Sequence, residues 1–253
     1  MTLPSVLVTG GAKRLGRGIC ERFAEAGWHV IVHYNRSSDS AEALAAALPS
    51  AQAVQCDLSD PLAGEDMVRN LADKLGDWRC LVNCASMFKA DEVTRLDPMT
   101  NARSMTINAA SPALMAQTYL ASAKSNAGRC VIQVTDQKLA NLNPDFFSYT
   151  MSKSAADIAA RMLAMAVKGN DRVHTLSPGA ILPSHDQSAQ EADRSHTLNL
   201  LQRRTGVAEV ADAALFLAEG PLASGQNIHV DSGQHLLDQT RDVIFIERKG
   251  SEA

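Results

Sequence analysis

Tyr149 and Lys153 stand four residues apart, a spacing that suits acid–base chemistry. In a helix this spacing places the two side chains on one face, one turn apart. An ammonium close to a phenol favours the phenolate, so we expect Lys153 to lower the pKa of Tyr149 from its usual value of about 10. The pair therefore indicates a proton donor that works near neutral pH.

A glycine-rich turn near the start of the chain is a second segment whose residues could bind a ligand. The run 5–9 is strand-like, and the segment 9–18 (TGGAKRLGRG) leads into a predicted helix. The first glycine permits a tight turn, and the helix N-terminus offers unpaired N–H groups to a pyrophosphate. We expect the dinucleotide-binding residues of this turn to be Gly10, Lys13, Arg14, Leu15 and Gly16.

Arg14 occupies a place where dinucleotide folds often have glycine. Its planar guanidinium could reach the pyrophosphate or an anionic edge of a substrate. A solvated arginine at the start of a helix is the alternative.

The residues after the second predicted strand favour NADPH over NADH. An NAD enzyme usually has a carboxylate there, bound to the ribose hydroxyls. This chain has none before Asp39, whereas Arg36, Ser37 and Lys13 would attract a 2′-phosphate. The other predicted cofactor residues of this region are His33, Tyr34, Asn35, Asp57 and Leu58. Asp57 suits a contact with the adenine amino group, and it suits equally the N-cap of the next helix.

Short apolar runs alternate with longer amphipathic ones along the whole chain. The predicted strands are 5–9, 28–33, 51–56, 79–83, 129–135, 172–176 and 226–230, and the predicted helices lie near 15–26, 40–48, 60–75, 97–125, 149–168 and 207–219. Several strands are continuous apolar runs, which indicates that both faces of the sheet are covered. This alternation predicts an α/β fold: a single Rossmann-type, doubly wound parallel sheet with helices on both faces.

We expect one dinucleotide-binding and catalytic domain over residues 1–237 and a C-terminal tail over 238–253, since 253 residues suit an undivided doubly wound domain. Residues 180–205 have weak periodicity and are predicted to be a substrate loop. In the tail, 243–246 (VIFI) is apolar enough to need burial, for which another subunit is one candidate. The Ala- and Met-rich helices at 104–125 and 151–167 favour a homo-oligomer, with a tetramer preferred, and burial within the monomer is the alternative.

The charge and residue composition of the chain argue against several classes of binding partner. A formal net charge of −4 argues against broad binding to nucleic acid or an anionic membrane. The first residues lack the pattern of a signal peptide, and no apolar run reaches the roughly 18 residues that span a bilayer. The five cysteines and the histidines His174, His185, His196, His229 and His235 show no metal-ligand spacing. We therefore expect a cytoplasmic protein with reduced thiols, no metal, and a small-molecule substrate.

Together the motifs resemble the short-chain dehydrogenase/reductase family over nearly the whole chain. The matching features are the 9–16 turn, Asp57, Asn83-x-Ala85, Asn108, the Tyr149/Lys153 pair, 177–179 (SPG) and 230–233 (VDSG). The resemblance implies that Tyr149 is the proton donor, that Lys153 holds the nicotinamide ribose, and that Asn108 supports a proton relay. It also places Asn83, Ala85, Ser86, Pro178 and Gly179 beside the cofactor.

One departure from the family points to a branch within it. The family normally has a serine at the end of the fifth strand, where this chain has Thr135 followed by Asp136, thirteen residues before Tyr149. A carboxylate would disfavour a developing alkoxide but could deliver a proton to a ring nitrogen. The same exchange is found in pteridine reductases, which the chain also resembles at 9–16, 33–37 and 83–88.

That resemblance implies a pterin substrate, reduced from the dihydro to the tetrahydro form. Phe88 would stack on the pterin opposite the nicotinamide, and Ser86 and Arg14 would contact the pterin or the cofactor phosphates. Asp136 and Tyr149 would protonate the ring as hydride arrives from NADPH.

Two other functions stay open at this point. One is an NADPH-dependent carbonyl or enoyl reductase of the same fold, in which Phe88 is a loop anchor and Asp136 a helix cap or an ion-pair partner. The other is a catalytically silent NADPH-binding protein, against which the intact Tyr149/Lys153 pair argues. Within the pterin hypothesis, dihydromonapterin, dihydrobiopterin, dihydrofolate and oxidised pterin are all candidate substrates.

Overall fold

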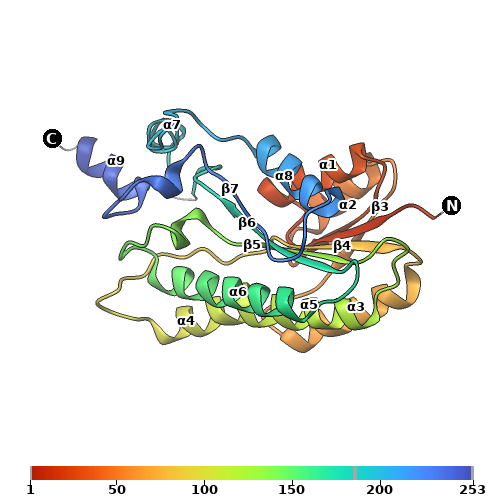
Figure 1. Cartoon of the computed structure of the whole chain (residues 1–253). Coiled ribbons are helices and arrows are strands. Elements are labelled where there is room, and N and C mark those ends of the chain that lie inside the picture. Colours follow the sequence, from red (N-terminus) through yellow and green to blue (C-terminus); the bar gives the residue numbers. More distant parts are fainter. Residues whose placement is uncertain (1, 185–186, 252–253) are drawn as a thin grey trace.

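A computed structural model describes residues 2–184 and 187–251 of the chain. Within these ranges one parallel sheet has the strand order β3-β2-β1-β4-β5-β6-β7 (Figure 1). The strands are β1 (Ser5–Val8), β2 (His29–Tyr34), β3 (Ala51–Gln55), β4 (Trp78–Asn83), β5 (Cys130–Val134), β6 (Arg172–Pro178) and β7 (Asn227–Val230). Each falls within about two residues of its predicted range, and the predicted doubly wound α/β fold is confirmed.

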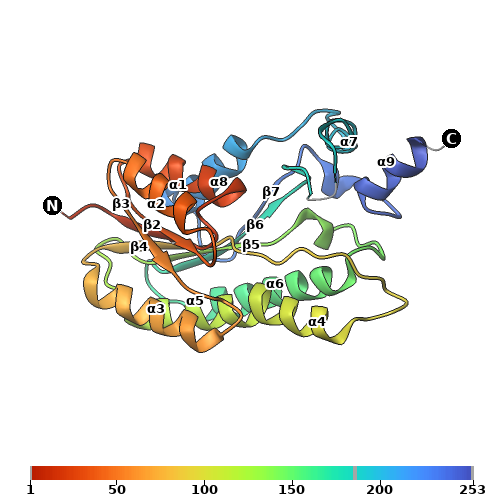
Figure 2. The same ribbon diagram turned by 180° about the vertical axis from the view of Figure 1, so that it is seen from behind.

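Helices cover both faces of the sheet (Figures 1 and 2). One face carries α1 (Arg14–Glu25), α2 (Ser38–Ala47) and α8 (Val207–Glu219), and the other carries α3 (Pro61–Lys74), α4 (Pro98–Met105), α5 (Ser111–Ser122) and α6 (Phe147–Ala166). Because side chains alternate along a strand, Val6 and Val8 enter one hydrophobic core and Leu7 the other. All three side chains are fully buried, as expected of a strand with both faces covered.

The strand order changes direction between β1 and β4, which neighbour each other although two strands separate them in sequence. In open α/β sheets a ligand binds outside the carboxyl ends of the strands at such a point. The chain segments that leave β1 and β4 there are the glycine-rich turn and the segment after Asn83.

The predicted helix 97–125 is interrupted. It consists of α4, a π-helical turn over Thr106–Ala110, and α5. Pro112 has no N–H, so the carbonyl of Asn108, four residues earlier, lacks its ordinary α-helical partner. The sequence thus sets the irregular turn around Asn108.

Asp60, and not Asp57, caps α3. Its carboxylate accepts hydrogen bonds from the N–H groups of Leu62 and Ala63, and Pro61 starts the helix. Asp57 accepts instead from the N–H of Ser59, at 2.9 Å. The predicted N-cap role of Asp57 is therefore wrong.

The last part of the chain is more regular than expected. The predicted loop 180–205 contains α7 (Ala189–Ser195), which begins with a capping box between Ser188 and Glu191. The tail forms α9 (Val243–Ser251), which packs beside α7 (Figure 1). Val243 and Ile244 are buried against their own chain, so burial of this apolar segment does not require another subunit. A domain boundary at residue 237 stays a prediction. No helix in the described ranges is long and apolar enough to cross a membrane.

Candidate active site

A pocket of about 500 Å³ opens at the carboxyl ends of the strands. This volume suits a small-molecule or cofactor site. Its walls come from the glycine-rich turn, the segment after β4, the ends of β5 and β6, helix α6 and the C-terminal tail. The predicted site residues that line it are Gly10, Lys13, Arg14, Leu15, Gly16, Ala85, Ser86, Phe88, Asp136, Tyr149, Lys153, Pro178 and Gly179.

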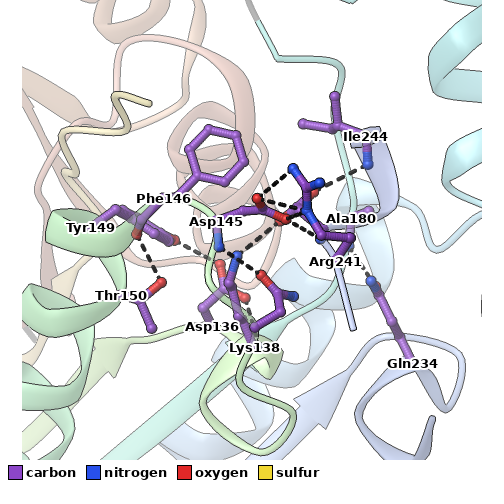
Figure 3. Close-up of polar contacts among 12 residues, drawn as sticks. Asp136, Lys138, Asp145, Phe146, Tyr149, Thr150, Ala180, Gln234, Arg241 and Ile244 are labelled. Atoms are coloured by element: carbon purple, nitrogen blue, oxygen red, sulfur yellow. Dashed lines mark hydrogen bonds and ion pairs between the residues drawn. The ribbon is translucent and has the colours of Figure 1, made fainter. Parts of the chain in front are cut away.

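Tyr149 and Asp136 form one hydrogen-bonded pair in this pocket (Figure 3). The Tyr149 hydroxyl donates to Oδ2 of Asp136 at 2.6 Å, and Oδ1 of Asp136 accepts from the N–H of Lys138 at 2.9 Å. Burial raises the pKa of the Asp136 carboxyl above its usual value. The Tyr149 pKa is raised well above its usual value, first by burial and then by the negative charge of Asp136. Both shifts favour the protonated forms.

The expected lowering of the Tyr149 pKa by Lys153 is therefore wrong for this structure. The Lys153 ammonium donates to the carbonyl of Val134 at 2.8 Å and lies 5.7 Å from the centre of the Tyr149 ring. Burial also lowers the pKa of Lys153 itself. The four-residue spacing does place both side chains on one face of α6, but loss of solvent and Asp136 outweigh the ammonium.

Asn108 holds the segment that follows β4. Its side-chain amide donates to the carbonyl of Met87 and to the hydroxyl of Ser152, both at 2.9 Å, and its oxygen accepts from the N–H of Met87 at 2.7 Å. The Ser86 hydroxyl donates to the same oxygen at 3.3 Å. Asn108 thereby fixes Ser86 and the next residues at the pocket wall.

Phe88 stands beside Tyr149 at the pocket wall. Its ring meets the Tyr149 ring edge to face, with centroids 4.8 Å apart, and stacks on Phe146 with centroids 4.3 Å apart. Phe88 is 42% exposed, so part of the ring is open to a ligand. Sequence reasoning missed Phe146, which takes a left-handed backbone conformation just before α6.

The glycine-rich turn is packed too tightly for side chains. Gly10 has φ +67°, and a Cβ there would lie 3.0 Å from Cα of Ala85. A Cβ on Gly16 would lie 2.3 Å from the carbonyl oxygen of Gly10. Thr9 joins this turn to the β4 segment, because its hydroxyl oxygen accepts from the N–H groups of Cys84 and Ala85 at 2.9 and 3.0 Å.

His33 supports the turn from beneath, and its predicted direct role in cofactor binding is not what the geometry favours. The ring is buried, its Nδ1 lies 3.0 Å from the N–H of Gly10, and its Nε2 lies 3.1 Å from the carbonyl of Cys56. An N–H can only donate and a carbonyl only accept, so the ring is neutral with its proton on Nε2. Burial lowers the His33 pKa to about 4, which is consistent with that form.

The features around the turn fit an anionic dinucleotide. No side chain caps α1, and no acidic residue stands in its first turn, so its N–H groups and dipole suit a pyrophosphate. Lys13 and Arg36 are exposed, and within the described residues neither is in an ion pair. Ser37 precedes α2 without capping it through its side chain. At the end of β4, the buried Oδ1 of Asn83 has no partner among the described residues.

Three further predicted residues, Leu58, Tyr34 and Asn35, do not line the pocket. Leu58 is buried in the core of the α3 face, Tyr34 packs against the other core, and Asn35 is exposed. Arg14 has φ +54° and donates to the carbonyl of Pro183 at 2.7 Å, so it bridges the turn to the loop after β6.

The histidines and cysteines were predicted to have no metal role. No group of three or more His, Cys, Asp or Glu side chains suited to a metal occurs in the ranges that the structure describes. His185 lies outside those ranges. His196 lines the pocket, which the sequence did not suggest.

This fold and site define a class: an oxidoreductase that uses a nicotinamide dinucleotide. The chain belongs to the short-chain dehydrogenase/reductase family, since residues 10–235 match the family model described as enoyl-(acyl carrier protein) reductase.

Relatives of this chain include pterin and carbonyl reductases. The solved structure of FolM alternative dihydrofolate reductase 1 from Brucella canis, complexed with NADP, is 36% identical, covers 94% of this chain and 96% of its own, and superposes with a TM-score of 0.87. Pteridine reductase 1 of Leishmania tarentolae is 28% identical, over 93% of this chain and 97% of its own. The putative ketoacyl reductase 2 of granaticin polyketide synthase from Streptomyces violaceoruber is 29% identical, over 92% and 97%.

Proposed function

We propose that this protein is an NADPH-dependent reductase that converts a dihydropterin to a tetrahydropterin. The observation that carries the proposal is the Asp136–Tyr149 hydrogen bond, which places a carboxyl group in the pocket at hydrogen-bonding distance from the phenol. The solved relative named as a dihydrofolate reductase and the relative named as a pteridine reductase support the same substrate class.

The chemistry of a carboxyl group favours a C=N substrate over a ketone. Ketone reduction develops an alkoxide, which a neighbouring carboxylate repels. Reduction of a ring C=N bond adds hydride to carbon and a proton to nitrogen, so the site must supply a proton. Burial raises the pKa of Asp136, and a carboxyl group that keeps its proton at higher pH is a better proton donor near neutrality.

Each residue then has a defined task. The Tyr149–Asp136 pair passes one proton to the ring nitrogen, and bulk solvent returns it afterwards. Phe88 offers an aromatic face to the pterin, Ser86 and Arg14 offer polar contacts, and Asn108 keeps Ser86 in place. Lys153, with its ammonium between Val134 and Tyr149, is the group that would hold the nicotinamide ribose.

The cofactor would be held by Gly10, Gly16 and the open first turn of α1. Lys13, Arg36 and Ser37 provide two cations and a hydroxyl for a 2′-phosphate, which is why NADPH is proposed over NADH. When bound, NADPH supplies the hydride.

A second candidate, a carbonyl reductase, is favoured by one observation: the ketoacyl reductase relative is as similar in sequence as the pteridine reductase. The test is NADPH oxidation by purified protein with a panel of dihydropterins, dihydrofolate, oxidised pterin, ketones and enoyl thioesters. Turnover of a pterin that disappears in Tyr149→Phe supports the proposal. Turnover of ketones alone would assign the chain to the second candidate.

We also infer a homo-oligomer, with a tetramer preferred. One face of α6 leaves Ile158, Met162 and Met165 exposed at 55, 65 and 87%. An apolar row of this kind on one helix suits burial against a second copy of the chain.

A further inference from the structure

The C-terminal tail forms one wall of the pocket within the same chain. Asp242, Val243 and Ile244 line the same pocket as the glycine-rich turn. The buried Ile244 packs with Phe146 and Tyr149 in a small hydrophobic cluster. The tail is therefore part of the candidate active site, although it lies about 90 residues beyond Tyr149 in sequence.

Two ion pairs hold this wall in place, and Figure 3 labels both partners of one of them, Arg241 and Asp145. On the pocket side, Nζ of Lys138 lies 3.3 Å from Oδ2 of Asp242. On the far side, Arg241 contacts Asp145 at 2.8 Å, and the N–H of Asp242 donates to Asp145 at 2.7 Å. Lys138 and Asp242 line the pocket, whereas Arg241 and Asp145 do not. The Arg241–Asp145 pair therefore holds the backbone of Asp242 from outside the pocket.

The Lys138 side chain is buried at 4% exposure, and the Asp242 side chain is partly buried at 18%. Removing two charges from water costs about as much as their attraction returns, so such a pair is weak evidence of a stabilising role. Lys138 is also the residue whose N–H donates to Asp136. Its position connects the tail with the proton-donating pair.

Asp242 and Asp136 are the two carboxylates in the pocket lining, as far as the structure describes it. The negative charge of Asp242 raises the pKa of both Asp136 and Tyr149, while Lys153 lowers that of Asp136. The charged and titratable side chains that face this space from all lining elements are Lys13, Arg14, Cys84, Asp136, Lys138, Tyr149, Lys153, His196 and Asp242. Apart from Asp136 itself, Asp242 is the carboxylate among them, and its effect on the Asp136 pKa is opposite in direction to that of Lys153.

We propose that Asp242, oriented by Lys138, is a positioning residue that keeps the transferable proton on the Asp136–Tyr149 pair. The inference rests on the proposed proton transfer to a substrate ring. Under this inference the C-terminal tail affects proton transfer as well as forming a wall of the pocket. The negative charge of Asp242 disfavours loss of the proton, and Lys138 partly offsets that charge and fixes its position.

The test breaks this one ion pair from each side. Activity should fall as pH rises through the apparent pKa of the Asp136–Tyr149 pair, because the proton is then lost. Asp242→Asn removes the negative charge, so the pH at which activity is lost should decrease by on the order of half a unit. Lys138→Met leaves the charge of Asp242 without its cationic partner, so the pH at which activity is lost should increase. The double variant should return it close to the wild-type position.

The control is Glu247→Gln, which removes one charge from the Arg194–Glu247 ion pair between α7 and α9, outside the pocket lining, and should leave the pH of the activity loss unchanged. A role confined to fastening the tail predicts the same direction for Asp242→Asn and Lys138→Met, since both release the same contact. Equal directions, or no displacement in either variant, would overturn the inference.

A second readout needs no substrate, so it separates this inference from the proposed function. In protein labelled with ¹³C at the aspartate carboxyls, the Asp136 signal is assigned by its loss in Asp136→Asn. Its titration should move to lower pH in Asp242→Asn and to higher pH in Lys138→Met. An unmoved titration would contradict the inference even if the wild type reduces pterins. If the Asp136 titration moves as expected but the protein reduces no pterin, the electrostatic effect of Asp242 is supported and the proposed pterin substrate is refuted.

Discussion

The phenol of Tyr149 donates a hydrogen bond of 2.6 Å to the carboxyl group of Asp136, inside the pocket where β5 ends. In this arrangement the tyrosine is not a free acid activated by a lysine. It is one half of a hydrogen-bonded pair in which both groups favour their protonated forms, because burial raises the pKa of each. The reaction that suits such a pair is one that consumes a proton at nitrogen.

Cofactor choice should depend on Arg36. Arg36→Asp places a carboxylate where the 2′-phosphate of NADPH is expected. Loss of a charge-assisted hydrogen bond costs about 1.5–3 kcal/mol, so the Kd for NADPH should rise roughly 10- to 100-fold. The Kd for NADH should change far less. Fluorescence titrations with both cofactors measure this, with Arg69→Asp on the outer surface of α3 as the control. Equal losses for both cofactors would refute the assignment of Arg36.

The close approach at Gly16 should be intolerant of any side chain. In Gly16→Ala the new Cβ would lie 2.3 Å from the Gly10 carbonyl oxygen, so the turn must shift. We expect a destabilisation of about 1–3 kcal/mol and weaker NADPH binding. Urea unfolding and cofactor titration measure the two effects. Gly76→Ala is the control, since its nearest neighbour would be 3.7 Å away. A Gly16→Ala protein that binds NADPH normally would contradict the packing described for the turn.

Stability should fall as pH falls from about 6.5 toward 4, in part through His33. Its pKa is lowered to about 4 from 6.5, so in this range the unfolded chain binds a proton that the folded chain does not. This contribution is present above pH 6.5, and about 2 kcal/mol of it is lost by pH 5. His174 has a similar shift and adds to the loss. Urea unfolding at pH 7 and pH 5 should show a smaller loss in His33→Gln than in the wild type. An identical pH dependence in the two proteins would mean that His33 is not held neutral.

The exposed face of α6 should be the site of self-association. Ile158→Glu together with Met162→Lys puts two charges on that face and should convert an oligomer to a smaller species. Light scattering during size-exclusion chromatography gives the mass directly. Ala43→Glu together with Ala47→Lys, an exposed pair at the same spacing on α2, serves as the comparison of equal charge. A wild-type protein that elutes as a monomer would end the proposal.

Much of the fold could be predicted because its signals are local. Continuous apolar runs marked the buried strands, and the glycine turn and the Tyr149/Lys153 spacing marked the site. Helices α7 and α9 were missed because they are short, and α7 is stabilised by a capping box and by packing against α9 rather than by a long apolar stripe.

Other features depend on contacts between distant residues. Lys138 and Asp242 are 104 residues apart, and no spacing rule connects them. The proton affinity of Tyr149 depends on burial and on Asp136, neither of which the local spacing contains. His33 was predicted to touch the cofactor because it stands in a cofactor segment. Only the alternation of side chains across β2 and the approach of Gly10 show that it lies beneath the turn.

The central claim is that Asp136 adapts a short-chain reductase site to a pterin. The most direct measurement compares kcat/KM of the wild type and Asp136→Ser for a dihydropterin and for a simple ketone, with NADPH binding measured in parallel. We expect Asp136→Ser to lower dihydropterin reduction by about 10²-fold or more, to spare or improve ketone reduction, and to leave the Kd for NADPH unchanged. Undiminished dihydropterin turnover in Asp136→Ser, with intact cofactor binding, would contradict the account.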